Sequence, residues 1–198
     1  KGSGMFMACD ISKYSEVAAV VDCCVENYGR LDYAINNAGI LGTMALTADC
    51  TEDNWDEITN VNLKGTWICM KHELVQMMKQ GEGVIVNIAS NAGMRGVPEL
   101  PAYSASKGGV VVLTRTAALE YASSGIRINA INPGLIETEM VKKQIKANPE
   151  AVDVFIAEEP IGRMGQPEEI AAAAVWLCSD SASFVTGHLM NVDGGLLA

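Results

Sequence analysis

The sequence is poor in positive charge. Its 198 residues include 14 Lys and Arg against 24 Asp and Glu, which gives a formal net charge of −10. Proteins that bind nucleic acids gather Lys and Arg against the phosphate backbone, and this sequence contains no run rich in these residues. The charge balance therefore argues against a nucleic-acid partner.

Long apolar segments are absent as well. The longest unbroken apolar run covers residues 170–178, whereas a membrane-spanning helix needs about 20 apolar residues. The apolar content of 49% is nevertheless that of a protein with a core, which argues against disorder. We therefore expect a globular protein with no membrane partner.

The sequence offers little for metal binding. His72 and His188 stand far apart, with no second ligand near either one. The six cysteines show neither metal-binding spacing nor a dense disulfide framework, so we interpret them as reduced thiols. They are Cys9, Cys23, Cys24, Cys50, Cys69 and Cys178. We expect no metal and predict a cytoplasmic protein.

Five short apolar segments have the composition of buried strands. They are rich in Val, Ile and aromatic residues, and Gly, Asn or Asp flanks them. They cover residues 5–9, 31–36, 84–89, 126–131 and 189–192. Helical patterns lie between or beside them, at residues 15–28, 55–78, 103–122 and 167–177. This alternation predicts an α/β fold: a single domain with a doubly wound, Rossmann-like parallel sheet.

Polar residues follow the predicted strands at one edge of this sheet. Asp10 comes after the first strand, residues 36–39 close the second, Ser90 follows the third and residues 132–134 the fourth. Ligands of such sheets bind beyond the carboxyl ends of the strands. The stretch 139–165 is polar and reads as an insertion of short helices, which we expect to act as a lid over the site.

Tyr103 and Lys107 stand four residues apart on a predicted helix and therefore share one face. Alone the pair is weak evidence, because a surface Tyr beside a solvated Lys is an ordinary arrangement. Ser90 past a buried strand and Asn62 within another predicted helix give the pair a context.

With these residues in place, the sequence resembles the short-chain dehydrogenase/reductase family over essentially the whole chain. The matching segments occur in the family's order and spacing. They are Asn36-Asn37-Ala38-Gly39, residues 61–65, residues 86–90, Tyr103-Ser104-Ala105-Ser106-Lys107, Asn132-Pro133-Gly134 and Asp193-Gly194-Gly195. The resemblance implies an NAD(P)-dependent oxidoreductase that transfers a hydride between the coenzyme and the CH–OH group of a small alcohol or ketone.

The resemblance also implies the catalytic roles. Tyr103 would be the general acid and base, Lys107 its helper, Ser90 the donor to the substrate oxygen and Asn62 the organiser of a water-linked proton path. Because a phenol has a pKa of about 10, work near neutral pH requires a lowered pKa. We expect the Lys107 ammonium and the oxidised nicotinamide to supply that shift.

Further matches imply contacts with NAD or NADP. Asp10 and Ile11 would meet the adenine, while Asn36, Ala38 and Gly39 would line the adenosine ribose. Tyr103 and Lys107 would reach the nicotinamide ribose. The nicotinamide itself would lie against Pro133, Gly134, Ile136 and Thr138. For Asn37 a purely structural role in the strand-to-helix connection stays open.

The substrate pocket is the least determined part. Besides Ser90 and Tyr103, we expect Met94, Val97, Leu100 and Met140 to form an apolar wall, since apolar linings are usual in such pockets. Core filling is an equally ordinary role for the methionines. The substrate itself cannot be read from the sequence.

The family's fold opens with two strand–helix units that include a glycine-rich phosphate turn. The sequence contains no such turn, and the Asp10 match places residue 1 just before the family's third strand. We therefore expect residues 1–198 to be the C-terminal three-quarters of the domain, with the residue that selects NAD or NADP outside it. The alternative is a non-catalytic family member that acts only through protein contacts. The resemblance further implies a homotetramer or homodimer, with the helix at 103–122 and the last strand at the interfaces.

Overall fold

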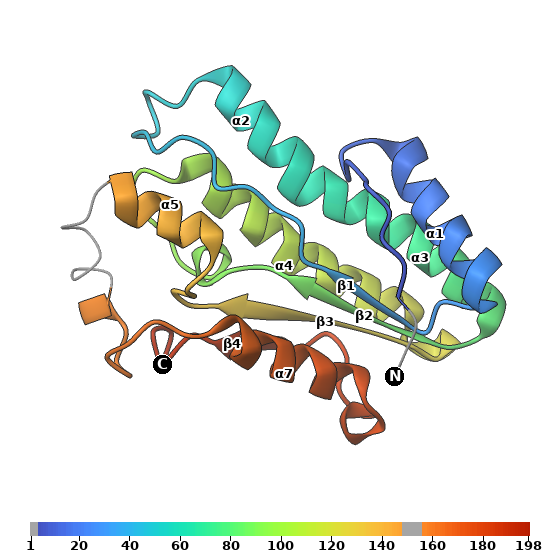
Figure 1. Cartoon of the computed structure of the whole chain (residues 1–198). Helices are drawn as coiled ribbons and strands as arrows, with labels where there is room; N and C mark the ends of the chain where they lie inside the picture. Colours follow the sequence, from blue (N-terminus) through green and yellow to red (C-terminus); the bar gives the residue numbers. More distant parts are fainter. Residues whose placement is uncertain (1–3, 148–155) are drawn as a thin grey trace.

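A computed structural model describes residues 4–147 and 156–198 of the chain (Figure 1). Its strands are β1 (Tyr33–Asn36), β2 (Gly83–Ile88), β3 (Ile126–Pro133) and β4 (Leu189–Val192). Its α-helices are α1 (Tyr14–Tyr28), α2 (Glu52–Thr59), α3 (Thr66–Gln80), α4 (Pro101–Tyr121), α5 (Glu139–Ala147) and α7 (Pro167–Cys178). Shorter turns are the π-helical η1 (Asn60–Gly65) and the 3₁₀ turns η2 (Asn91–Gly93), η3 (Ala122–Ser124) and η4 (Asp180–Ala182).

The strands form one parallel sheet in the order β1-β2-β3-β4. The two central strands are almost wholly buried, and Ile85, Val86 and Ile128 have no exposed surface. Continuous burial explains why β2 is apolar at successive positions from Val84 to Val86. Strand β3 is buried as well but includes Asn129 and Asn132, which are fully buried polar residues. The predicted α/β parallel sheet is confirmed.

Helices cover both faces of this sheet (Figure 1). On one face α3 and α4 pack through a core that includes Met70, Met77 and Ala118. On the other face α7 packs through Ala174 and Leu177. Helix α1 lies outside α3, against Ile68 and Cys69. No described helix combines the length and the apolar character that crossing a membrane requires.

Our prediction of a strand at residues 5–9 is wrong, because the structure forms no strand there. A strand exists through hydrogen bonds to a neighbouring strand, and none of the described segments pairs with these residues. Strand β1 correspondingly lies at the edge of the sheet, where Tyr33 is 57% exposed.

The helix that we expected at residues 55–78 is interrupted. Its first part, α2, begins at Glu52, where the Thr51 side chain accepts a hydrogen bond from the Asn54 amide and caps the helix. The π-helical turn η1 then separates α2 from α3. Such turns are rare and concentrate at functional sites. Here the turn contains Asn62, one of the predicted site residues.

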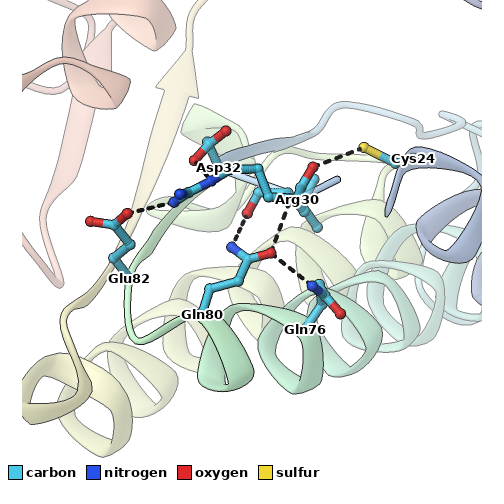
Figure 2. Close-up of polar contacts among 7 residues, drawn as sticks. Cys24, Arg30, Asp32, Gln76, Gln80 and Glu82 are labelled. Carbon is cyan, nitrogen blue, oxygen red and sulfur yellow. Dashed lines mark hydrogen bonds and ion pairs between the residues drawn. The ribbon is translucent and has the colours of Figure 1, made fainter. Parts of the chain in front are cut away.

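A polar cluster fixes the amino-terminal end of β1 (Figure 2). The Arg30 guanidinium pairs with Asp32 and Glu82. The Gln80 side chain accepts from the Leu31 amide at 2.9 Å and donates to the Leu31 carbonyl at 2.8 Å. These contacts tie the α1–β1 connection to the α3–β2 connection, at the end of the sheet opposite the predicted site.

The predicted insertion at 139–165 lies only partly within the described residues, since residues 148–155 fall outside them. Its first part forms α5. Its last part runs beside the segment that follows β3: Ile136 and Gly165 form an isolated parallel bridge, and the Gly165 amide donates to the Leu135 carbonyl at 2.9 Å.

Candidate active site

Lys107 is a buried lysine at the carboxyl end of β2. Its side chain reaches from α4 to the last residue of that strand, where the ammonium donates to the Ile88 carbonyl at 2.8 Å. The same ammonium lies 5.9 Å from the centre of the Tyr103 ring. Burial lowers the pKa of Lys107 to about 8. The predicted pair on one face of α4 is therefore present.

Tyr103 is a half-buried phenol beside this ammonium. Burial raises the pKa of Tyr103, and the hydroxyl of Ser90 acts in the opposite direction. The lowered pKa that we expect depends in part on the oxidised nicotinamide, and without a coenzyme the pKa of Tyr103 is raised. The reason is that removing a phenolate from water costs more here than the neighbouring protein groups return.

Ser90 lies two residues after the end of β2 and is the N-cap of the turn η2. Its side-chain oxygen accepts from the Ala92 amide at 3.1 Å, and its hydroxyl donates to the Asn91 side chain at 3.2 Å. The cap fixes the side chain at the edge of the sheet, close to Tyr103.

Asn62 is fully buried in η1 and holds two other segments of the chain. The side-chain oxygen of Asn62 accepts from the backbone amide of Ile40 at 2.8 Å, and its side-chain NH₂ group donates to the backbone carbonyl of Ile40 at 2.8 Å. The same amide donates to the Ser106 hydroxyl at 3.2 Å, one residue before Lys107. The side chain therefore connects the segment after β1 to α4.

Gly39 completes this cluster. A Cβ at this position would lie 3.2 Å from Oδ1 of Asn62 and 3.5 Å from Nζ of Lys107. The structure thus brings the Gly39 backbone, Asn62 and Lys107 together, and it brings Ser90 and Tyr103 together. These residues come from four separate segments that meet at the carboxyl ends of β1 and β2.

The other predicted coenzyme residues border the same edge. Ile11 lies against Gly65 at the end of η1, and Asp10 is exposed and accepts from the amide and hydroxyl of Ser12. Asn36 is held within the sheet by hydrogen bonds to two other side chains. Pro133 ends β3 and residues 134–136 follow it, while Thr138 directly precedes α5 and its hydroxyl oxygen accepts from the Val141 amide.

The predicted substrate residues lie in the segments after η2 and in α5. Val97 and Leu100 are half-buried, whereas Met94 and Met140 are 43% and 37% exposed. Two methionines with this much exposed surface are not core filling. They leave apolar surface on the segment after η2 and on α5.

Three side chains that matter to this edge were not among the predicted residues. Ser106 lies inside the matched motif around Tyr103, so its position was open to prediction. Glu73 and Glu159 are buried carboxylates whose partners lie 37 and 24 residues away in the sequence. No local pattern marks such residues.

The site fits a nicotinamide coenzyme. Among the described residues the Ile88 carbonyl is the one hydrogen-bond acceptor of the Lys107 ammonium, a group with three donors. A buried cation with spare donors, next to a backbone without a side chain at Gly39, suits the hydroxyls of a ribose.

Comparison with known proteins agrees with this geometry. A family model described as enoyl-(acyl carrier protein) reductase matches residues 1–197. The 4-formylbenzenesulfonate dehydrogenase of Comamonas testosteroni is 40% identical over 98% of this chain and 78% of its own length. The chain belongs to the short-chain dehydrogenase/reductase family.

Solved structures of this family superpose closely. The crystal structure of levodione reductase gives a TM-score of 0.93 at 41% identity and covers 96% of this chain and 75% of its own. NAD⁺-bound xylitol dehydrogenase gives 0.91 at 34% identity, covering 96% and 78%. Other matching structures contain NADP or NADPH. The predicted family, the oxidoreductase activity on CH–OH groups and the use of NAD or NADP are confirmed, and the non-catalytic alternative is not supported.

Proposed function

We propose that the chain carries out this hydride transfer with Tyr103 as general acid and base. The observation that carries the proposal is the buried Lys107 ammonium beside the Tyr103 ring, at the edge of the sheet where the Gly39 backbone also comes close to the ammonium. The coenzyme, when bound, supplies or accepts the hydride.

The side chains handle the proton and the substrate oxygen. In the reducing direction the Tyr103 hydroxyl gives its proton to the oxygen that forms from the carbonyl. The Lys107 ammonium stabilises the phenolate that remains, which offsets the cost of burying it. The Ser90 hydroxyl donates to the same substrate oxygen and orients it. Asn62 holds η1 against α4, and we assign it the organisation of the proton path.

The coenzyme would lie along the edge of the sheet from residue 10 to residue 138. We assign its adenosine side to Asp10, Ile11, Asn36, Ala38 and Gly39. We assign its nicotinamide side to Tyr103, Lys107, Pro133, Gly134, Ile136 and Thr138. The preference between NAD and NADP stays open.

The substrate would be a small alcohol or ketone with an apolar body. Ser90 and Tyr103 would hold its oxygen, and Met94, Val97, Leu100 and Met140 would contact its carbon skeleton. Their apolar surface supports this choice, since apolar walls bind by excluding water and polar groups at one end set the orientation. We further propose that α5 covers this pocket.

We also propose a homotetramer or homodimer in the cytoplasm. Helix α4 exposes Val112 and Leu119, which are 62% and 85% exposed, on its outer face. A contiguous apolar patch on the surface often marks a contact between subunits. Six free cysteines support a reducing compartment.

The test of the catalytic role is Tyr103→Phe. We expect kcat to fall by a factor of about 10² to 10⁴, because this change removes the proton donor. The dissociation constants of NADH and NADPH, measured by fluorescence titration, should change little. The control is Tyr121→Phe on the same helix, which should keep its activity. Unchanged turnover in Tyr103→Phe would refute the assignment.

A further inference from the structure

Glu159 is a buried carboxylate outside the catalytic cluster. It lies in the segment before α7, and only 5% of the residue surface is exposed. One carboxylate oxygen accepts a hydrogen bond from the Leu135 amide at 2.7 Å. A buried charge is costly unless a partner compensates it, so this contact is the main compensation that the side chain receives.

The carboxylate is wedged between two backbone segments. A Cβ at Gly134 would lie 2.9 Å from one of its oxygens, and a Cβ at Gly194 would lie 3.2 Å from the other. Beside it is a cavity of about 60 Å³ lined by residues of both segments. Glycine at the two positions therefore gives the carboxylate its place between the loop after β3 and the turn after β4.

The loop after β3 has few other side-chain supports. Among the described residues, Glu159 is the one residue whose side chain hydrogen-bonds to the backbone of residues 133–136. The remaining contacts are between backbones: Gly134 donates to Val192, and Gly165 donates to Leu135. Substitution at position 159 leaves these backbone hydrogen bonds intact and removes only the hydrogen bond that the Leu135 amide donates to the Glu159 side chain.

We propose that Glu159 is a positioning residue that fixes the loop 133–136 against the coenzyme by accepting the Leu135 amide. The inference rests on the proposed function, which places the nicotinamide against this loop. Glu159 acts through Leu135 and touches neither coenzyme nor substrate. It also links the segment 156–165 to the coenzyme site, where the Ile161 amide adds a bond to the Gly194 carbonyl at 3.1 Å.

The experiment compares two substitutions of nearly equal size. Glu159→Gln keeps a side-chain oxygen that can accept from Leu135, whereas Glu159→Met fills the same space without an acceptor. Glu168→Ala is the control, because Glu168 is an exposed acidic residue in the first turn of α7. All three are made in the whole chain.

The first readout is hydrogen exchange of the Leu135 amide without coenzyme. We expect exchange to be about tenfold or more faster in Glu159→Met and nearly unchanged in Glu159→Gln and in the control, because the lost bond is to a charged acceptor. The second readout is the dissociation constant for NADH and NADPH. It should rise about tenfold in Glu159→Met, and the coenzyme KM should rise more than kcat falls.

Each outcome is decisive. The inference is overturned if Glu159→Met leaves Leu135 exchange or coenzyme affinity unchanged, or if Glu159→Gln loses as much affinity as Glu159→Met. If the unaltered protein, made with any segment that precedes these residues, binds neither coenzyme, the proposed function fails. The Leu135 exchange then still decides whether Glu159 holds the loop.

Discussion

At the scale of single residues, a chain of hydrogen-bonded polar side chains runs along the face of the sheet that α3 and α4 cover. The Asn36 amide donates to Glu73 and to Asn87, both at 3.0 Å, and the Asn87 amide donates to the Thr114 hydroxyl at 2.9 Å. The chain connects α3 to α4 through β1 and β2. Buried polar groups are stable only when they are paired, so these four side chains specify one another's orientation.

Glu73 is the ionisable member of this chain, and burial raises its pKa to about 7. A raised carboxyl pKa means that folding disfavours the charged form. The penalty is absent below the ordinary pKa of about 4.5, grows between the two values and is complete above pH 7. Ionised Glu73 therefore lowers the stability of the protein as the pH rises.

We expect Glu73→Gln to remove this dependence. At each pH we compare the free energy of unfolding of the variant with that of the unaltered protein. The stability gained by the variant should be about 2 kcal/mol larger at pH 8 than at pH 5. Denaturant unfolding at the two pH values measures it. Glu26→Gln, on the exposed side of α1, is the control and should show no such change. A difference that is equal at both pH values would contradict the buried ionisation.

At the scale of elements, the sequence predicted those helices and strands whose residues form a local apolar or helical pattern. The apolar runs of β1–β4 predicted four strands, and the helical pattern at residues 103–122 predicted α4 within two residues. The turn η1 could not be predicted, because it is held by contacts of Asn62 with Ile40 and Ser106, which are distant in sequence. The partners of Glu159 were hidden for the same reason.

The contact between η2 and α4 sets the distance of Ser90 from Tyr103, and two glycines allow it. A Cβ at Gly93 would lie 2.7 Å from the backbone carbon and oxygen of Lys107. A Cβ at Gly108 would meet only the Gly93 oxygen, at an ordinary 3.5 Å. Both glycines lie where η2 packs against α4, but only at Gly93 does this packing require the absence of a side chain.

We therefore expect opposite results from two alanine substitutions. Gly93→Ala should lower the free energy of unfolding by about 1–3 kcal/mol, because a backbone cannot move aside as a side chain can. It should also lower kcat, since η2 carries Ser90 away from Tyr103. Gly108→Ala should raise stability by up to about 1 kcal/mol through helix propensity. Thermal unfolding with activity assays decides this, and equal effects would refute the argument.

At the scale of the whole molecule, charge and exposed apolar surface oppose each other. A net charge of −10 keeps copies of the chain apart. The outer face of α4 nevertheless carries Val112 and Leu119 seven residues apart, on one side of the helix. Nearby, Leu63, Trp67 and Leu113 line a surface depression of about 390 Å³. Association on this face has to bury enough apolar surface to overcome the repulsion between acidic subunits.

Leu119→Glu tests whether this face joins the subunits. Burying a leucine contributes about 2 kcal/mol to the association of the subunits, and a symmetric contact buries one leucine from each copy. A glutamate at this position loses that contribution. The variant should therefore form a smaller assembly. Sedimentation velocity should show the shift, and added salt should partly reverse it by screening the new charge. Leu46→Glu is the control, because Leu46 is 59% exposed on the loop before α2. The proposed contact through α4 is wrong if Leu119→Glu sediments as the unaltered protein does, or if Leu46→Glu dissociates the assembly equally.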